Sequence, residues 1–324
     1  MIGHRGASGY RPEHTAEAYE LAFELGADAV EPDIVATRDG VLVVRHENEI
    51  SGTTDVASRP EFASRRTSKV IDGALLEGWF TEDFTWAELS TLRAVERLPA
   101  VRPNNRSFDG RSPILRLRDV VRIVDAAQAR ADRQLVMVAE IKHATYFASI
   151  GLPLDELLAL ELRDWATNDN IIWESFEQTV LHQVRDRGLP GRLVYLVESS
   201  GSPADLVASL GRRAIPYSAH ITAAGLARLR SAGVDGVSVD KSLLLRQDGT
   251  TTDLVDRAHA AGLLAFVWTL RAENRFLARA LRRGKSPRDY GDWVAEFGSI
   301  LATGVDAVFA DQPDLVLDLL RRRP

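Results

Sequence analysis

Hydrophobic and polar positions follow two recurring patterns along the chain. Short runs of β-branched and aliphatic residues, typical of buried strands, alternate with stretches in which apolar residues recur at helical spacing. Because such alternation is typical of a parallel sheet covered by helices, the pattern predicts an α/β fold. The predicted strands lie at residues 1–4, 29–35, 41–45, 135–141, 171–176, 193–197, 236–239, 264–269 and 307–310.

This set holds one strand more than a (β/α)₈ barrel needs. Thr37-Arg38-Asp39-Gly40, between the second and third strands, contains the Asp-Gly pair that favours a tight hairpin. Strands joined by a hairpin run antiparallel, so we expect the third strand to be an appendage of the second. The other eight then form a (β/α)₈ TIM barrel, and the hairpin brings His46 back near Glu31.

We expect one domain, residues 1–324, with an inserted subdomain at about 47–113 beside the active face. A structureless loop of this length is uncommon in a compact domain. Five aromatic residues are interpreted as the small core of the insert: Trp79, Phe80, Phe84, Trp86 and Phe108. Helical spacing, with capping residues or prolines at several starts, predicts helices at residues 15–25, 86–92, 117–131, 154–165, 178–187, 203–210, 223–232, 252–261, 287–301 and 313–322.

Composition narrows the classes of function. A chain of 324 residues with 45% hydrophobic content can bury a large core. The net charge of −6 provides no overall basic surface, so we expect a small substrate and no binding to extended nucleic acid. No apolar run is long enough to cross a bilayer. The lack of cysteine excludes disulfides, thiolate metal sites and cysteine nucleophiles.

The start of the chain bears on where the protein acts. Met1-Ile2 leads directly into the first predicted strand, without a charged and apolar leader. We expect a secreted or periplasmic protein whose leader has been removed, and a short cytoplasmic form is the alternative. No obligate protein partner is expected.

Polar residues gather where the predicted strands end. Glu31 and Asp33 are two residues apart in one strand and therefore point to the same side, as do Glu140 and Lys142 in another. An apolar strand that ends in converging polar groups is typical of the active face of a (β/α)₈ barrel. His4 follows the first strand in the same way.

Each of these residue types suits the cleavage of a phosphodiester. The carboxylates of Glu31, Asp33 and Glu140 are hard oxygen ligands for Ca²⁺ or Mg²⁺. Arg5 and Lys142 can hold phosphate oxygens. The imidazoles of His4 and His46, which titrate near neutrality when unperturbed, could remove one proton and deliver another. The alternative is that they are ordinary histidines and ion pairs at strand ends.

The chain resembles the glycerophosphodiester phosphodiesterase family, in particular its longer bacterial type, which is often secreted or periplasmic. The resemblance covers nearly the whole length. One small departure is Ala310 before Asp311, where many relatives have threonine. The motifs that carry the resemblance are His4-Arg5-Gly6, Pro12-Glu13-His14-Thr15, Glu31-Pro32-Asp33, Val44-Arg45-His46-Glu47, Gly78-Trp79-Phe80-Thr81-Glu82-Asp83-Phe84-Thr85, Glu140-Ile141-Lys142-His143, Ser175-Phe176, Val267-Trp268-Thr269 and Phe309-Ala310-Asp311.

The resemblance implies a (β/α)₈ barrel and one divalent metal ion on Glu31, Asp33 and Glu140. Calcium is the usual ion of the longer type, and magnesium is the alternative. The resemblance also implies that His4 and His46 form the acid–base pair and that Arg5 and Lys142 bind phosphate. Phe176 and Trp268 are interpreted as packing on the carbon side of the glycerol, with barrel core as the alternative.

These inferences lead to one hypothesis for function. The chain would hydrolyse glycerophosphodiesters, such as glycerophosphocholine or glycerophosphoethanolamine, to glycerol 3-phosphate and an alcohol, through a cyclic phosphate. The alternatives are a lysophospholipase D-like enzyme acting on lysolipids and a non-catalytic binding protein for glycerophosphodiesters. Glu13 either anchors Arg5 or stabilises a helix start, Asp311 is interpreted as a turn or helix cap, and His14 and His143 have no assigned role.

Overall fold

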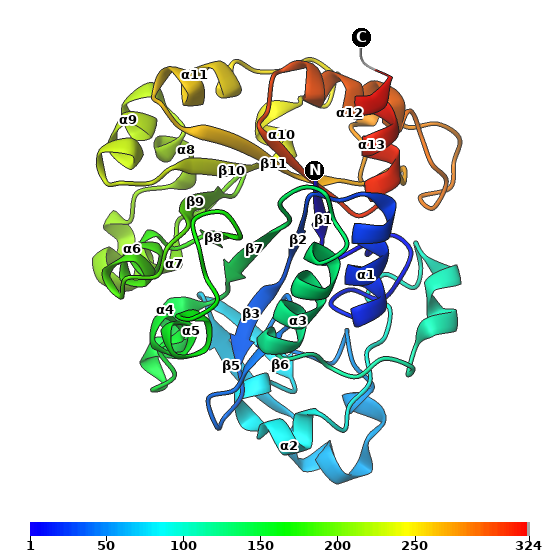
Figure 1. Ribbon diagram of the computed structural model, residues 1–324, viewed down its shortest axis with the longest axis vertical. Helices are drawn as coiled ribbons and strands as arrows, with labels where there is room; N and C mark the ends of the chain where they lie inside the picture. The colour runs from blue at the N-terminus through cyan, green and yellow to red at the C-terminus, as the bar shows by residue number, and fades with distance from the viewer. Residues whose placement is uncertain (323–324) are drawn as a thin grey trace.

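A closed barrel of parallel strands forms the centre of the computed structural model, which describes residues 1–322 (Figure 1). Most predicted strands match observed ones to within a residue or two. The strands of the described chain are β1 (Ile2–His4), β2 (Ala29–Glu31), β3 (Asp33–Ala36), β4 (Leu42–Val44), β5 (Thr67–Ile71), β6 (Ala74–Gly78), β7 (Val136–Ile141), β8 (Ile171–Ser175), β9 (Arg192–Val197), β10 (Gly236–Asp240), β11 (Leu264–Leu270) and β12 (Ala307–Ala310).

The barrel closes between its second strand and β7. The sheet order is β2-β1-β12-β11-β10-β9-β8-β7-β3-β4, and β2 also pairs with β7. All neighbours within the barrel run parallel, which confirms the predicted (β/α)₈ fold. β4 pairs antiparallel with β3 and lies outside the barrel, so the predicted hairpin is also confirmed.

Pro32 interrupts the second barrel strand without changing its register. Ala29 pairs with Val136 in β2, and Asp33 pairs with Glu140 in β3, at the same offset along β7. Proline has no N–H to donate to the sheet, but its carbonyl accepts a hydrogen bond from the Glu140 N–H at 3.0 Å. β2 and β3 therefore act as one strand in the barrel.

The inward side chains of the barrel change from apolar to polar along the strands. Apolar residues fill the interior, and each contributes about 1.5–3 kcal/mol when fully buried. Two residues later on several strands the same inward face carries the polar groups His4, Glu31, Glu140 and Asp311. The pleat therefore places the chemistry at one end of a dry core. The interior residues are Ile2, Ala29, Val138, Val194, Phe266 and Phe309.

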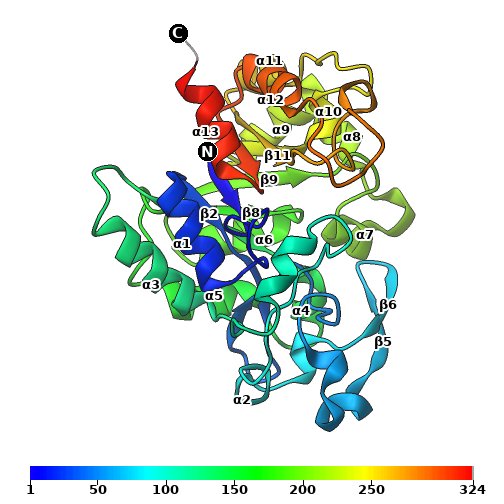
Figure 2. The same cartoon turned by 90° about the vertical axis from the view of Figure 1, so that its right-hand side faces the viewer.

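Helices surround the barrel on the outside (Figures 1 and 2). Among residues 1–322, no helix has the length and the run of apolar residues needed to span a bilayer. The helices are α1 (Ala16–Leu25), α2 (Trp86–Leu89), α3 (Leu117–Gln128), α4 (Ala144–Ser149), α5 (Leu154–Leu162), α6 (Gln178–Asp186), α7 (Ala204–Leu210), α8 (Tyr217–His220), α9 (Ala223–Ser231), α10 (Lys241–Leu244), α11 (Leu254–Ala260), α12 (Trp293–Ala302) and α13 (Pro313–Arg321).

The predicted helix at residues 287–301 begins too early. Residues 287–292 form a loop, in which the carbonyls of Pro287 and Asp289 accept hydrogen bonds from the backbone of residues 274 and 275. Asp292 then caps α12 by accepting from the Ala295 N–H at 3.2 Å. The short helices α4, α8 and α10 were not predicted, because one or two turns give too little periodic signal.

Residues 47–113 lie between β4 and α3 and form short elements rather than a structureless loop. Besides α2 they contain four 3₁₀ helices, Val56–Ser58, Pro60–Arg65, Thr81–Asp83 and Pro103–Phe108, and the unpredicted hairpin β5–β6. Of the predicted aromatic core, Trp79, Phe80 and Phe84 are buried, whereas Trp86 and Phe108 are half-buried beneath arginine side chains. In Figure 2 the hairpin projects beside α4 and α7.

Candidate active site

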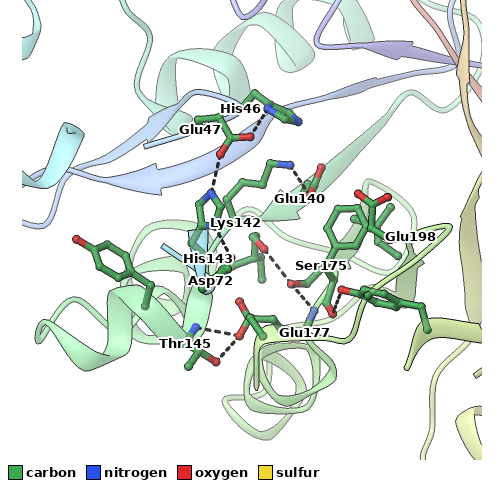
Figure 3. Close-up of a pocket in the computed structure, with 18 of the residues that line it drawn as sticks. His46, Glu47, Asp72, Glu140, Lys142, His143, Thr145, Ser175, Glu177 and Glu198 are labelled. Atoms are coloured by element: carbon green, nitrogen blue, oxygen red, sulfur yellow. Dashed lines mark hydrogen bonds and ion pairs between the residues drawn. The ribbon is translucent and has the colours of Figure 1, made fainter. Parts of the chain in front are cut away.

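A cavity of about 770 Å³ opens at the carboxyl ends of the barrel strands. Its walls include strand ends of the barrel, the turn of the β5–β6 hairpin, α4 and α7 (Figure 3). Of the predicted site residues, Asp33 is fully buried behind the wall. The others line the cavity: His4, Arg5, Glu31, His46, Glu140, Lys142, Phe176 and Trp268.

Three buried carboxylates converge at one side of this cavity. Glu31, Asp33 and Glu140 each offer an oxygen, and these oxygens lie within 4.8 Å of one another. Within residues 1–322, Oε2 of Glu31 and Oδ1 of Asp33 accept no hydrogen bond, and Oε1 of Glu140 faces the ammonium group of Lys142. Hard oxygen atoms at this spacing fit a divalent cation such as Ca²⁺ or Mg²⁺. The predicted ligand set therefore meets in one place and could bind a metal ion.

The charges of the three carboxylates differ in how they are balanced. Burial, together with repulsion from Asp33 and Glu140, raises the pKa of Glu31 well above its usual range. Burial also raises the pKa of Glu140 to about 8, against the opposing charge of Lys142. For Asp33, Lys142 and Arg5 outweigh burial and hold its pKa well below the usual range. Without a bound cation, Glu31 and Glu140 therefore favour their neutral forms, while Asp33 is ionised between two cations.

Arg5 and Lys142 are those two cations, and both are buried beside the carboxylates. Nε of Arg5 lies 3.0 Å from Oδ2 of Asp33, and Nζ of Lys142 lies 2.7 Å from Oε1 of Glu140. Burial would lower the pKa of Lys142, but the neighbouring carboxylates raise it above its usual value. A planar guanidinium fork and an ammonium group at one cavity wall can bind phosphate oxygens.

Asp311 holds the ring of His4. Oδ1 of Asp311 lies 2.5 Å from Nδ1 of His4, while Nε2 of His4 lies 3.4 Å from Oγ1 of Thr269. Asp311 also accepts hydrogen bonds from Arg102 at 2.6 Å and from Arg271 at 2.8 Å. The interpretation of Asp311 as a turn or helix cap is wrong, because its carboxylate is buried at the inner face of the barrel.

These contacts set the protonation of the His4–Asp311 pair. Despite burial, Arg271 and Arg102 hold the pKa of Asp311 well below its usual range. Burial and the charge of Arg5 lower the pKa of His4 to about 3. A neutral His4 that donates its Nδ1 proton to Asp311 leaves Nε2 with a lone pair, which is the form of a proton acceptor.

His46 follows β4 and lines the same cavity as His4. Its Nδ1 lies 2.8 Å from Oε1 of Glu47. Burial in the cavity wall, with the charges of Arg5 and Lys142, lowers the pKa of His46 to about 3. The structure thus brings both predicted histidines to one cavity, each with Nδ1 next to a carboxylate.

Glu13 and His14 support the site from behind. Glu13 accepts from Nη1 of Arg5 at 3.1 Å and from Nε of Arg97 at 2.7 Å, so it anchors Arg5. His14 Nε2 lies 2.9 Å from Oδ2 of Asp33. Partners of this kind orient the residues that they contact. His14 had no assigned role, although its position in the Pro12-Glu13-His14-Thr15 motif was a usable signal.

Phe176 and Trp268 form an aromatic wall of the cavity. Their rings meet edge to face at a centroid distance of 5.8 Å. Nζ of Lys142 lies 5.6 Å from the centroid of Phe176, and Nε1 of Trp268 donates to the Ser238 carbonyl at 3.2 Å. The wall places apolar surface next to the cation Lys142.

Sequence reasoning missed several residues of this site. Arg102 comes from the loop region before Pro103 and reaches Asp311 only through the fold, so no local pattern marks it. Arg271 and Asp311 follow barrel strands, and their position was a signal of the same kind that identified Glu140. His143 and Asp72 contact each other at the cavity rim, where Asp72 occupies the turn of the unpredicted hairpin.

Comparisons with known proteins identify the family of this chain. A sequence model of the Glycerophosphoryl diester phosphodiesterase family matches residues 4–315. The glycerophosphodiester phosphodiesterase GDPD6 of Arabidopsis thaliana is 30% identical over 325 residues, which cover 96% of this chain and 82% of that protein.

Solved structures share the fold at lower identity. A phosphodiesterase from Oleispira antarctica, solved in complex with the product sn-glycerol-3-phosphate, has a TM-score of 0.64 at 18% identity and covers 99% of this chain and 96% of its own. A glycerophosphodiester phosphodiesterase from Thermotoga maritima has a TM-score of 0.55 at 18% identity, covering 98% and 96%. Because the family match spans most of the sequence and the Arabidopsis relative aligns along nearly all of it, this chain belongs to the glycerophosphoryl diester phosphodiesterase family.

Proposed function

We propose that this chain is a metal-dependent glycerophosphodiester phosphodiesterase that releases glycerol 3-phosphate and an alcohol. The observation that carries the proposal is that His4, His46, Arg5, Lys142 and the carboxylate cluster share one cavity. Family membership, and the name of the Arabidopsis relative, support the same activity. A protein that only bound the substrate would need the cations but not both histidines.

The phosphate of the substrate would bind between Arg5 and Lys142. Arg5 is anchored by Glu13, and Lys142 by Glu140, so both cations are held in place before substrate enters. Preorganised charge of this kind stabilises the negative charge that builds up on phosphate oxygens in the transition state.

The divalent ion would be held by Glu31, Asp33 and Glu140, with Ca²⁺ as the proposed ion and Mg²⁺ as the alternative. When bound, it would neutralise charge on the non-bridging oxygens and lower the pKa of a coordinated hydroxyl. Glu31 and Glu140 must give up their protons to bind it, since burial favours their neutral forms.

The two histidines would move the protons. One imidazole takes the proton of the glycerol 2-hydroxyl as that oxygen attacks phosphorus, and the other donates a proton to the departing alcohol oxygen. The cyclic phosphate that results is opened by water, with the proton transfers in reverse. Burial lowers the pKa of both rings, so the ring that acts as the base is neutral. The ring that acts as the acid must first take up a proton from water, which the negative charge of the bound phosphate favours.

The remaining walls would bind the two alcohol parts of the substrate. Phe176 and Trp268 offer apolar surface for the carbon side of glycerol. Glycerophosphocholine and glycerophosphoethanolamine are the proposed substrates, because a cavity of about 770 Å³ accommodates a small diester.

An assay for glycerol 3-phosphate, coupled to its dehydrogenase, tests the proposal. The wild-type protein with Ca²⁺ or Mg²⁺ should convert glycerophosphocholine, and His4→Ala and His46→Ala should each lose at least about 10²-fold in kcat while keeping the fold. His259→Gln, which removes a histidine paired with Asp306 on the surface, is the matched control. Absence of product from the metal-loaded wild-type protein would contradict the proposed activity.

A further inference from the structure

Four ionisable side chains form a continuous chain from His46 to the turn of the β5–β6 hairpin (Figure 3). Nδ1 of His46 lies 2.8 Å from Oε1 of Glu47. The other oxygen of Glu47, Oε2, lies 3.0 Å from Nε2 of His143, and Nδ1 of His143 lies 2.6 Å from Oδ2 of Asp72. Acidic and basic groups therefore alternate along this row of four side chains, and the two atoms of each contact lie within hydrogen-bonding distance.

Two of these four residues, Asp72 and His143, have an unusual backbone conformation. Among residues 1–322, the non-glycine residues with a left-handed φ are Arg5, His14, Asp72 and His143, at 59°, 57°, 48° and 50°. Arg5 and His14 both contact Asp33 in the carboxylate cluster. Such conformations cost about 1–3 kcal/mol each and are retained mainly at functional sites. His143 shares this feature although it does not touch the cluster, whereas the φ of Asp72 is the one that a two-residue hairpin turn with Gly73 requires.

The charges of the neighbouring side chains keep Glu47 ionised. The side chain of His143 is only 14% exposed. Asp72 and Glu47 outweigh the burial of His143 and raise its pKa to about 9, so the ring is a cation at neutral pH. The hydrogen bond from His143 and the close contact with His46 in turn outweigh burial and lower the pKa of Glu47 below its usual value. The carboxylate that faces His46 is therefore fixed and charged.

The two histidines of the cavity have parallel surroundings. Nδ1 of His4 contacts Asp311, and Asp311 is held by the guanidinium groups of Arg102 and Arg271. At His46 the carboxylate is Glu47, and its cationic support is His143. In each case a carboxylate contacts Nδ1 of the histidine, and a cationic side chain holds that carboxylate in place. Nε2 is then the ring nitrogen available for proton transfer.

We propose that His143 and Asp72 are positioning residues for His46, acting through Glu47. His143 fixes the Glu47 carboxylate against Nδ1 of His46, and Asp72 fixes the ring of His143. This inference rests on the proposed function, because it assigns a role within that reaction. The β5–β6 hairpin would then have a role in positioning, because its turn supplies Asp72 and only the folded hairpin places Asp72 beside His143.

The test compares His143→Gln, Glu47→Gln and the double variant in the coupled assay with glycerophosphocholine. Removing a supporting partner of this kind typically lowers activity about 10–100-fold. We expect each single variant to lose kcat by that amount with KM changed less than about twofold, and the double variant to match Glu47→Gln alone. The His259→Gln control, which breaks a surface histidine–aspartate pair of 2.9 Å, should keep wild-type kcat.

Asp72→Asn provides a second test that leaves His143 in place. It should lower kcat in the same direction, and Asp72→Glu should restore part of the loss. The proposal would be overturned if His143→Gln kept the wild-type kcat. It would also be overturned if the loss of kcat in the double variant equalled the product of the losses in the two single variants. A lower melting temperature of Asp72→Asn with unchanged kcat would also overturn it, since that result describes a purely structural contact. Failure of the proposed function is distinct, because the wild-type protein would then release no glycerol 3-phosphate.

Discussion

Asp311 shows how a single buried carboxylate connects stability and chemistry. It is 1% exposed and contacts His4, Arg102 and Arg271 at once. Removing one partner of a buried charged group leaves the others without compensation, which costs far more than the loss of a surface pair. A change at this residue therefore affects the orientation of His4 and the free energy of unfolding together.

Asp311→Asn is predicted to reduce both properties. In Asp311→Asn, Nδ1 of His4 faces a neutral amide in place of a carboxylate, and Arg102 and Arg271 lose their shared counter-charge, so kcat should fall at least about tenfold and the protein should be destabilised by about 3–5 kcal/mol. The coupled assay and urea unfolding measure the two effects. Asp318→Asn, which removes an exposed carboxylate paired with Arg321, should change neither. An active Asp311→Asn protein would show that His4 does not depend on this contact.

His143 predicts a dependence of stability on pH. Its pKa is raised to about 9 in the folded chain, against about 6.5 when unfolded. The stabilisation is complete below pH 6.5, where both states hold the proton, and is lost as the pH rises to 9 and the folded state releases it. Urea unfolding from pH 6 to 9.5 should show that wild type loses on the order of 2 kcal/mol relative to His143→Gln. Parallel stability curves for the two proteins would contradict this assignment.

At the scale of elements, the sequence predicted those parts of the site that depend on strand periodicity. Glu31 with Asp33, and Glu140 with Lys142, were found because alternate residues share a face and the barrel turns that face inward. The β5–β6 hairpin was missed although Asp72-Gly73 carries the same turn signal as Asp39-Gly40. Its strands are largely exposed and lack a buried face, so the hydrophobic pattern does not mark them.

Gly73 tests whether the hairpin turn matters for catalysis. Gly73 has φ of +83°, and a Cβ added there would meet no atom within 4 Å, so Gly73→Ala strains only the backbone. We expect a loss of about 1 kcal/mol in stability and a lower kcat, because relief of the strain moves the adjacent Asp72. Gly110 has φ of +76° and equally open surroundings. Gly110→Ala should lose similar stability and keep the wild-type kcat. If the two variants had the same kcat, the hairpin turn would have no influence on the reaction.

At the scale of the whole molecule, closure of the barrel brings the two ends of the chain together. His4 and Asp311 are 307 residues apart in sequence yet lie 2.5 Å from each other. Arg102 reaches both Asp311 and Glu273 from outside the barrel. Contacts of this range depend on the three-dimensional path of the chain, so a local pattern cannot indicate them. Export of the protein stays a prediction, because nothing in a barrel fold specifies a compartment.

Metal binding should stabilise the whole fold, independently of activity. Three buried carboxylates within 4.8 Å offer one binding site in the folded chain only, and a cation that binds only the folded state stabilises it. At a hundredfold excess over Kd the expected gain is about 2.7 kcal/mol, which raises the melting temperature by several degrees. Thermal unfolding with chelator, then with excess Ca²⁺ or Mg²⁺, measures the shift.

The matched variants for this measurement are Glu31→Gln and Glu174→Gln. Both residues are buried glutamates of the barrel, on β2 and β8, but only Glu31 belongs to the carboxylate cluster. Glu31→Gln should abolish the cation-dependent shift because it removes one ligand, whereas Glu174→Gln should keep it. If the cation raised the melting temperature of Glu31→Gln as much as that of the wild-type protein, the ion would have to bind elsewhere, and these carboxylates would no longer account for metal dependence.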